Sequence, residues 1–433
     1  MRKWLFIALL LLGLSLLVSG EVSAAGPQID VLRVDGTINP VLAGYIERGI
    51  GLAEKHGATA CIIELDTPGG LDSSMRDIVQ SILEAEVPVV VWVPPGGRAA
   101  SAGAFITLAA HVAAMSPGTE IGAAHPVGIG EEIEGTMEEK VVNDAVAYIR
   151  SIADMRGRNA DWAEAAVRES RSSPALEALE LGVIDIVADN FDQLLIQLDG
   201  REVTLLSGEV VTLNTENADI NSIDMGLIER FLFIISDPNI AYILLSLGML
   251  GIFFELASPG AILPGVVGVI CLFLAFYSLG MLPVNYAGVI LIVLAFALFV
   301  ADIFIASHGL LTLGGIASLS VGSVMLLGNP MFHINRVLIA GVVVVILLFF
   351  AFLVRAIVLS RRAQQQTGRE AMVGKLAVAR TPLDPSGTIF VHGERWEAIL
   401  DQGRAEPGEE VVITKIEGLK MRVTKKKEEG GKG

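Results

Sequence analysis

A long stretch almost without charge limits what this chain can fold into. From residue 231 to residue 354 the Asp, Glu, Lys and Arg side chains are only Asp237, Glu255, Asp302 and Arg336. Over all 433 residues, 52% are hydrophobic and 18% are charged, whereas a soluble chain carries roughly 25% charged residues. The mean hydropathy is +0.61. The stretch therefore predicts a membrane domain, which we place at residues 231–360.

The membrane domain divides into five apolar segments. Each has the ~17–25 residues that a spanning helix needs, and short runs with Pro, Gly or polar residues separate them, so neighbouring helices form antiparallel hairpins. Arg355 lies near the end of the last segment, and Arg361 and Arg362 follow it, which places that end in the cytoplasm by the positive-inside rule. We expect a multi-pass protein of the cell membrane with about five transmembrane helices, at residues 239–257, 261–281, 286–306, 309–328 and 337–359.

The first 25 residues have the three parts of a secretory signal peptide. Arg2 and Lys3 form a basic head, residues 4–18 are apolar, and small residues end the segment at Ala24 and Ala25. We expect cleavage after one of these alanines; an uncleaved anchor helix is the alternative. In both cases residues 27–229 are extracytoplasmic.

Residues 27–229 show the pattern of an α/β domain. Buried-strand patterns alternate with helical patterns of 10–15 residues, which predicts crossover units on a mostly parallel sheet. The expected strands are residues 29–34, 59–66, 88–93, 112–115 and 183–187, and the main helices are residues 39–56, 72–85, 100–110 and 141–156.

Residues 367–426 predict a small all-β barrel. Five short alternating runs lie at residues 374–380, 387–392, 394–400, 409–416 and 419–423, and an OB-like closed barrel fits them best. Phe390 and Trp396 are its aromatic residues, and acids lie among its bases. A nucleic-acid platform combines a basic groove with stacking aromatics, and the whole chain has a net charge of −17. We therefore expect a protein-interaction or structural module that binds no nucleic acid.

The segment around Ser101 is the best candidate for chemistry. Ser101 lies among small residues (96–104, GGRAASAGA), where a strand turns into a helix. The positive end of a helix dipole favours a developing oxyanion. The backbone amides of Gly69, Gly70 and Ala102 are the candidate oxyanion donors. The alternative is that Ser101 only caps the helix and the glycines only form turns.

A nucleophilic serine needs a base. Lys55 and Lys140 are the only lysines of the exported region, and Lys140, at the start of the helix that follows a polar loop, is the candidate. A desolvated lysine can act as a general base; a surface lysine paired with Glu138 and Glu139 is the alternative. His125 is the rival base. We find no metal-binding spacing and no phosphate loop, so we expect no metal and no cofactor, and Cys61 and Cys271 indicate neither a disulfide nor a Cys-based metal site.

These residues resemble the ClpP/crotonase-like superfamily, and specifically the long form of the NfeD family, which are membrane-bound serine proteases of the ClpP class. The resemblance covers nearly the whole chain. It implies a ClpP/crotonase-like N-terminal domain and an OB-fold NfeD-type C-terminal domain. The motifs that carry it are residues 66–70 (DTPGG), 99–103 (AASAG), 139–144 (EKVVND), 157–159 (GRN), 177–185 (EALELGVID) and 393–398 (GERWEA).

The resemblance implies a Ser–Lys dyad made of Ser101 and Lys140. ClpP itself uses Ser, His and Asp, and His125 stands about where its histidine would. The aspartate of ClpP falls near Glu169 and Ser170, where this chain has no Asp, and this departure favours the dyad. The family also implies stomatin- or flotillin-like membrane partners, cleavage of their apolar segments, and a homo-oligomer.

Three functions compete at this point. The first is a membrane-anchored serine endopeptidase that cuts apolar segments. The second is a catalytically idle scaffold that organises a membrane assembly. The third is a crotonase-type enzyme that acts on acyl-CoA. It is the weakest of the three, because an exported domain would rarely meet CoA.

Overall fold

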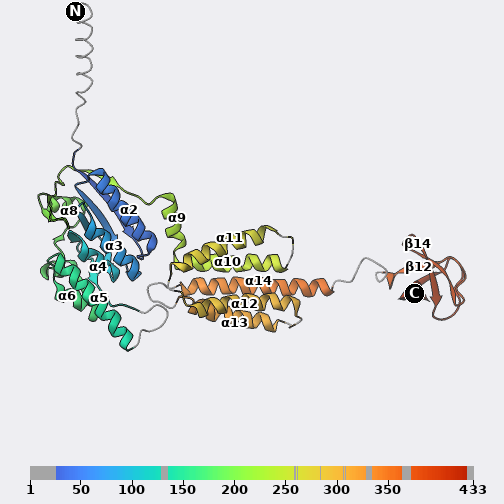
Figure 1. Cartoon of the computed structure of the whole chain (residues 1–433). Helices are drawn as coiled ribbons and strands as arrows, with labels where there is room; N and C mark the ends of the chain where they lie inside the picture. The colour runs from blue at the N-terminus through green and yellow to red at the C-terminus, as the bar shows by residue number, and fades with distance from the viewer. Residues whose placement is uncertain are drawn as a thin grey trace, which may run out of the picture. The chain divides into compact units, whose positions relative to one another are not determined.

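The computed structural model describes residues 26–127, 135–257, 260, 262–282, 284–305, 307, 309–327, 334–362 and 372–426. The predicted signal peptide, residues 1–25, lies outside the described residues. An α/β domain, a set of apolar helices and a β-barrel follow one another along the chain (Figure 1). These three parts confirm the predicted fold class.

A parallel six-stranded sheet forms the centre of the α/β domain. Its order is β11-β1-β2-β3-β5-β8, and every neighbouring pair is parallel. The edge strand β11 was not predicted. The strands are β1 (Gln28–Asp35), β2 (Ala60–Asp66), β3 (Val89–Val93), β5 (Val112–Met115), β8 (Ile186–Val187) and β11 (Asp219–Ser222).

Alternate residues of the central strands bury opposite faces of the sheet. Ile63 and Val91 belong to a core on one face, whereas Ile62 and Val90 belong to a core on the other, because successive strand side chains point to opposite sides. Figure 1 shows α2, α3 and α4 grouped beside the sheet and α8 apart from them. The helices are α2 (Pro40–His56), α3 (Asp72–Glu84), α4 (Ala102–Ala109), α5 (Thr136–Met155), α6 (Ala160–Arg168), α7 (Ala175–Glu180) and α8 (Phe191–Leu198), and a two-stranded sheet is formed by β9 (Glu202–Thr204) and β10 (Val210–Thr212).

A second, three-stranded sheet lies next to the predicted active-site segment. It has the order β4-β6-β7, with β4 (Arg98–Ala100), β6 (Glu120–Gly122) and β7 (Ser172–Pro174). Strands of three residues are too short to show a period, so the sequence did not predict them. One consequence is a correction: the helix predicted from residue 100 begins at Ala102, because residues 98–100 are paired with β6.

The described part of the apolar region contains five helices at the predicted positions, preceded by a short helix that was not predicted. Among the described residues, α10 and α11 are long and apolar enough to cross a membrane, and α12, α13 and α14 contain shorter apolar stretches. The number of spans stays a prediction. The helices are α9 (Leu227–Ile235), α10 (Pro238–Ala257), α11 (Ile262–Gly280), α12 (Tyr286–Phe304), α13 (Leu310–Met325) and α14 (Arg336–Arg362).

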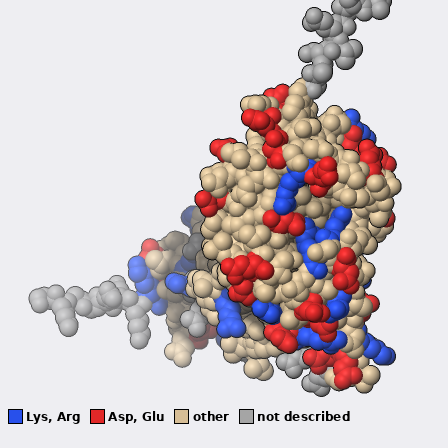
Figure 2. Space-filling model, turned by 90° about the vertical axis from the view of Figure 1, so that its left-hand side faces the viewer, with Lys and Arg blue, Asp and Glu red and all other residues tan. Residues whose placement is uncertain are grey.

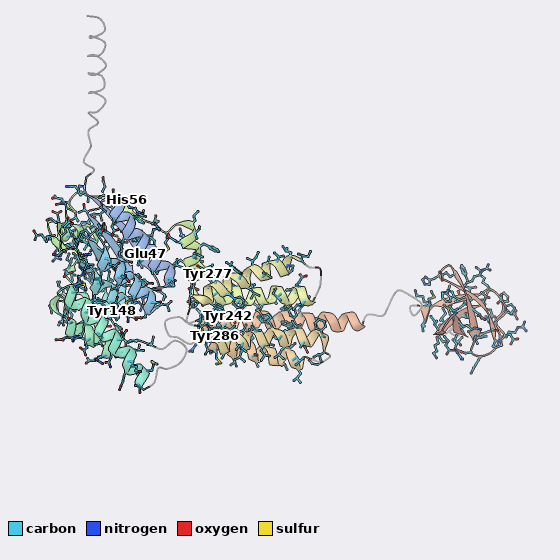
Figure 3. The ribbon with its side chains drawn as sticks, in the orientation of Figure 1. Glu47, His56, Tyr148, Tyr242, Tyr277 and Tyr286 are labelled. Atoms are coloured by element: carbon cyan, nitrogen blue, oxygen red, sulfur yellow. The ribbon has the colours of Figure 1, made fainter. Side chains whose placement is uncertain are left out.

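Glycines let the apolar helices pack backbone to backbone. A Cβ at Gly251 of α10 would lie 2.6 Å from the carbonyl oxygen of Pro264, and one at Gly268 of α11 would lie 2.9 Å from that of Gly248. Small residues at such contacts allow the close approach that stabilises helix pairs in membranes. The hydroxyls of Tyr242 and Ser323 add a buried 2.8 Å hydrogen bond between α10 and α13 (Tyr242 is labelled in Figure 3).

The C-terminal part is a closed five-stranded barrel, as predicted. Its order is β12-β13-β14-β16-β15. Inward-facing residues such as Ile389, Ala398 and Met421 fill its core. The strands are β12 (Leu376–Ala379), β13 (Ser386–Val391), β14 (Glu394–Leu400), β15 (Glu410–Glu417) and β16 (Lys420–Lys425).

Two arginines hold the C-terminal end of α4. Arg158 is 7% exposed and donates to the carbonyls of Leu108 and Ala110 and, at 2.6 Å, to Asp185 Oδ2. Arg156 Nε donates to the carbonyl of Ala109 at 2.8 Å. Cations at a helix C-terminus complement the macrodipole, so the motifs around residues 157–159 and 185 serve to position α4.

A neutral histidine lies beside these arginines. His111 Nδ1 accepts the backbone N–H of Val89 at 3.1 Å. Burial first, and then the positive charges of Arg156 and Arg158, lower the pKa of His111 to about 3. The pKa of His111 in the folded protein therefore lies below its unfolded value of ~6.5. The neutral ring contributes its full stability above pH ~6.5, and this contribution is lost as the pH falls from there towards 3.

We expect His111→Gln to flatten this pH dependence. The amide oxygen of the glutamine can still accept the Val89 N–H, but the amide does not titrate. Hydrogen exchange of the β3 and β5 amides measures the opening free energy. Between pH 7 and pH 5 the wild-type protein should lose about 2 kcal/mol more than the variant, by linkage. Equal losses in the two proteins would show that His111 is protonated in the folded domain.

Candidate active site

Ser101 lies at a sharp turn between β4 and α4. Its backbone has φ 53° and ψ −113°, a left-handed region that non-glycine residues rarely occupy and that costs about 1–3 kcal/mol. Its N–H donates to the carbonyl of Gly122 at 2.8 Å, and its own carbonyl accepts the N–H of Ala104 at 3.0 Å. Such a strand-to-helix turn presents a half-buried serine at the N-terminus of a helix, as in hydrolases that use a nucleophilic serine.

A glycine brings α4 against the turn that follows β2. A Cβ at Gly103 would lie 2.7 Å from Thr67 Cγ2, so a larger residue there would push α4 away. Thr67 in turn pairs with β4, because its N–H donates to the carbonyl of Arg98 and its carbonyl accepts the N–H of Ala100. The turn after β2 and the segment of Ser101 are thus joined directly.

The glycines of this turn differ in what their amides do. Gly69, at φ +118°, donates its N–H to Thr67 Oγ1 at 3.1 Å. The backbone of Ile38 forms hydrogen bonds with both neighbours of Gly70. Its N–H donates to the carbonyl of Gly69, and its carbonyl accepts the N–H of Leu71. The N–H groups of Gly70 and Ala102 have no acceptor among the described residues. Of the three candidate oxyanion donors, these two are available and Gly69 is already engaged.

His125 has a partner that the sequence did not indicate. Its Nδ1 lies 2.8 Å from the carbonyl oxygen of Val167. A carbonyl can only accept, so Nδ1 carries the proton and Nε2 of the neutral ring keeps its lone pair. ClpP uses an aspartate, which would fall near Glu169 in this chain. Here a backbone carbonyl, that of Val167, orients the imidazole instead.

Lys140 lies in the second turn of α5, not at its start. The helix begins at Thr136, which corrects the prediction that Lys140 is at the start of the helix that follows the polar loop. Lys140, Glu138 and Glu139 are all exposed, and no ion pair of Lys140 occurs among the described residues. Within the described residues, Lys140 is therefore a solvent-exposed lysine without an ion pair. Residues 128–134, which precede α5, lie outside the described part of the chain.

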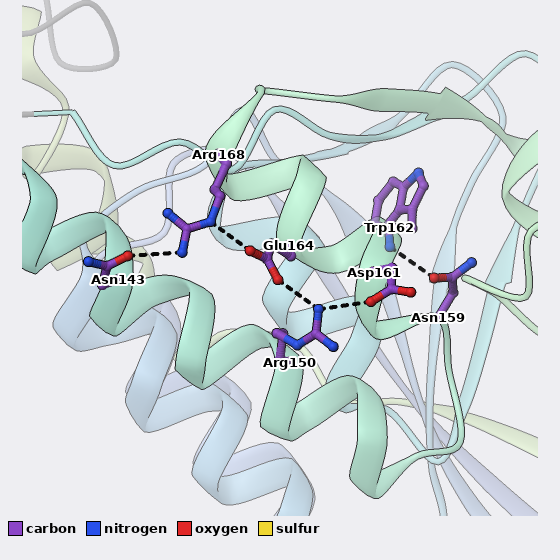
Figure 4. Close-up of polar contacts among 7 residues, drawn as sticks. All are labelled: Asn143, Arg150, Asn159, Asp161, Trp162, Glu164 and Arg168. Atoms are coloured by element: carbon purple, nitrogen blue, oxygen red, sulfur yellow. Dashed lines mark hydrogen bonds and ion pairs between the residues drawn. The ribbon is translucent and has the colours of Figure 1, made fainter.

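The segment just after Lys140 is fixed by two arginines from other helices. Arg76 of α3 forms a 2.5 Å ion pair with Asp144 and lies over the ring of Tyr148, 4.4 Å from its centroid. Arg168 of α6 donates to Asn143 at 2.9 Å (Figure 4). Tyr148 stacks on Phe105 of α4, with the ring centroids 6.0 Å apart. These contacts join α5 to α4, the helix that begins directly after Ser101.

Figure 4 also shows a chain of ion pairs between α5 and α6. Glu164 accepts from Arg168 at 2.7 Å and from Arg150 at 2.7 Å, and Arg150 also donates to Asp161. Hydrogen bonds from Arg168 and Arg150 lower the pKa of Glu164. On the face of the α/β domain shown in Figure 2, acidic and basic side chains are intermixed rather than separated by sign. Within the described residues, no three His, Cys, Asp or Glu side chains form a metal-binding group.

Three family profiles match the chain in succession. Residues 28–223 match the NfeD1b N-terminal domain, residues 239–356 the NfeD integral membrane domain, and residues 369–425 the NfeD-like C-terminal, partner-binding domain. The membrane-bound protease PH1510 of Pyrococcus horikoshii is 36% identical over 415 residues, which are 93% of this chain and 94% of that protein. The chain belongs to the NfeD family.

Two further similarities extend this result. The membrane protein NfeD1b of Bacillus subtilis is 30% identical to this NfeD protein. The match covers 95% of this chain and 97% of NfeD1b. A solved structure, the 1510-N membrane protease specific for a stomatin homolog from Pyrococcus horikoshii, is 36% identical; it covers 49% of this chain and 100% of its own, with a TM-score of 0.44. The family predicted from the motifs is confirmed, and the protein has an integral membrane domain.

We expect Gly70→Ala to open the turn beside Ser101. A Cβ at Gly70 would lie 2.1 Å from the carbonyl oxygen of Ile38, so the bonds from Leu71 to Ile38 and from Ile38 to Gly69 must stretch. Hydrogen exchange of the Ile38 and Leu71 amides should accelerate on the order of tenfold or more, as expected for the loss of a buried hydrogen bond.

The matched control is Gly51→Ala in α2. No atom lies within 4 Å of a Cβ at that position, and alanine in a helix is more stable than glycine by about 0.5–1 kcal/mol. Exchange of the same two amides should be unchanged in the control. Unchanged exchange in Gly70→Ala would mean that the turn can accommodate a side chain.

Proposed function

We propose that this NfeD protein is a membrane-anchored serine endopeptidase with Ser101 as nucleophile and Lys140 as base. The observation that carries the proposal is the backbone of Ser101, which has a strained φ at the start of α4 while the nearby amides of Gly70 and Ala102 have no acceptor among the described residues. Strained residues persist where the surroundings enforce them, often at active sites. The 36% identity over 93% of the chain to a membrane-bound protease supports the same reaction class.

In the proposed first step, Ser101 Oγ attacks the scissile carbonyl carbon and its proton passes to the neutral amine of Lys140. The carbonyl oxygen becomes an oxyanion, which the N–H groups of Gly70 and Ala102 receive. The protonated lysine then gives its proton to the leaving amine, and water hydrolyses the acyl-enzyme. Lys140 is exposed, so a bound apolar peptide must cover it and exclude the water that stabilises its charged form.

A Ser–His arrangement is the second candidate mechanism. It is favoured by the 2.8 Å bond between His125 Nδ1 and the Val167 carbonyl, which leaves Nε2 able to accept a proton. A carbonyl orients the ring but carries no full charge, so it stabilises an imidazolium less than the aspartate of a complete triad would.

We propose that the substrates are apolar segments of stomatin- or flotillin-like membrane proteins. A similar solved protease is described as specific for a stomatin homolog, and the profile matched by residues 369–425 is described as partner-binding. On this proposal the barrel holds the partner while the α/β domain cuts, and the protein works as a homo-oligomer.

The proposed topology follows the chain. Residues 1–25 are a signal peptide, residues 27–229 form the extracytoplasmic protease domain, residues 231–360 cross the membrane about five times, and residues 367–426 form a cytoplasmic barrel. The described helices α10 to α14 and the positive-inside rule support this order.

The dyad predicts that Ser101→Ala and Lys140→Ala each remove most of kcat. The assay is cleavage of an apolar peptide by the full-length protein in detergent. Because the two residues act as one unit, the double variant should be hardly worse than either single variant. His125→Ala should cost only about 10-fold, against the ~10²–10⁴ expected when a general base is lost.

Two results would contradict this prediction in different ways. Full turnover by Lys140→Ala together with loss of turnover by His125→Ala would establish the Ser–His arrangement. Activity of Ser101→Ala equal to wild type, or no labelling of Ser101 by a fluorophosphonate, would favour the scaffold function. Lys55→Ala is the matched control, because Lys55 is the other lysine of the exported region.

The topology predicts which introduced cysteines a membrane-impermeant maleimide reaches on intact cells. Glu216→Cys in the α/β domain should be labelled and Gln402→Cys in the barrel should be protected; both positions are exposed. The background is Cys271→Ala. Cys61 can stay, because it is fully buried and burial raises the pKa of its thiol. Labelling of position 402 with protection of position 216 would reverse the proposed orientation.

A further inference from the structure

Helix α9 (Leu227–Ile235) carries an apolar face that the described chain leaves largely open, except at its last residue, Ile235, which is buried. Leu227 is 90% exposed, Ile228 75%, Phe231 49% and Ile234 51%. At 100° per residue these four side chains fall within an arc of about 120° on the helix. A helix with one such arc, free of charge, has the pattern of an amphipathic helix with its apolar side turned outward.

The opposite side of α9 is fixed to the α/β domain. Glu229 accepts from Arg48 Nε and Nη2, both at 2.7 Å, and from the backbone N–H of Gly226 at 2.7 Å. The ring of Phe233 packs over Gly36, where a Cβ would lie 3.2 Å from Phe233 Cζ. The helix therefore cannot rotate to bury its exposed side against this domain without breaking a bidentate ion pair.

The C-terminal end of α9 is bonded to the first helix hairpin of the integral membrane domain. The carbonyl of Ile235 accepts a hydrogen bond from Ser278 of α11, and the hydroxyl of Ser236 lies 3.4 Å from the sulfur of Met281. Helix α10 begins at Pro238, close in sequence to the end of α9. The start of α10 and the end of α11 mark one boundary of the apolar region, and α9 contacts both helices there (Figure 1).

We propose that α9 lies in the membrane–water interface, with Leu227, Ile228, Phe231 and Ile234 inserted among the lipids that surround α10 and α11. Interfacial helices bury their apolar face ~5–10 Å into the boundary between headgroups and acyl chains. Arg230 is exposed at the edge of the apolar arc, where a basic side chain reaches lipid phosphates. The bilayer is the occupant that continues from the adjacent spanning helices, so α9 holds the α/β domain at a set height on the membrane. This proposal does not depend on the catalytic one.

The test measures the depth of a nitroxide label in the full-length protein, reconstituted in nanodiscs of phosphatidylethanolamine and phosphatidylglycerol. Phe231→Cys and Ile228→Cys are made separately in the Cys271→Ala background. Ile196→Cys on α8 is the matched control, because Ile196 is apolar and 74% exposed on the α/β domain. The ratio of oxygen to nickel-chelate accessibility should be on the order of tenfold higher at both α9 positions than at residue 196, because oxygen partitions into the region that the helix occupies.

Two outcomes would overturn the proposal. A ratio at residues 228 and 231 equal to that at residue 196 would place α9 in water. Low accessibility to both reagents, with dipolar broadening that disappears when unlabelled protein is added, would show that a second copy of this chain covers the face. Two label positions keep the result independent of any single substitution.

Discussion

The close backbone contact between the turn after β2 and the first turn of α4 is the constraint on which the site depends. Gly103 leaves no room for a side chain at this contact, and Gly70 leaves none where the same turn meets Ile38. The pairing of Thr67 with β4 joins the turn to the segment of Ser101. Ser101 is the single residue between β4 and α4, and it has a left-handed backbone. The surrounding hydrogen bonds offset a strain of about 1–3 kcal/mol.

The two ends of helix α4 differ in their hydrogen-bonding partners. At the N-terminus, next to Ser101, the N–H of Ala102 has no acceptor among the described residues and lies at the positive end of the dipole. At the C-terminus, Arg156 and Arg158 donate to the last carbonyls, and Asp185 accepts from Arg158 and from the Ala113 N–H. Removing Asp185 would leave a buried cation without its carboxylate, which is strongly destabilising. Motifs far from Ser101 in the sequence thus serve to position it.

The sequence predicted the parts of this structure that have a clear period or a clear charge pattern. The parallel strands around Ile63 and Val91, the five apolar helices and the barrel are of this kind, and their signals are long runs. The three-residue strands β4, β6 and β7 have no period, and the start of α5 at Thr136 was hidden because its first turn is acidic and polar like the loop before it. Helix α9 was missed because its apolar residues merge into the apolar run that follows. The Val167 carbonyl that orients His125 could not be predicted, since a backbone partner has no side-chain signature. The roles of Ser101 and Lys140 stay predictions.

The choice between the two proposed bases depends on whether a bound peptide removes water from them. His125 is already oriented, but its partner is a neutral carbonyl, which would offset less of the charge that the imidazole gains than the aspartate of a complete triad would. Lys140 needs no orienting partner, but its exposed amine must lose its proton before it can accept one from Ser101. A polar substrate would leave water at the amine and keep it charged, whereas an apolar segment would remove that water and bring no compensating carboxylate. On the proposed dyad, the preference for apolar substrates and the use of a lysine base are therefore one requirement, because the substrate itself supplies the desolvation that makes the base active.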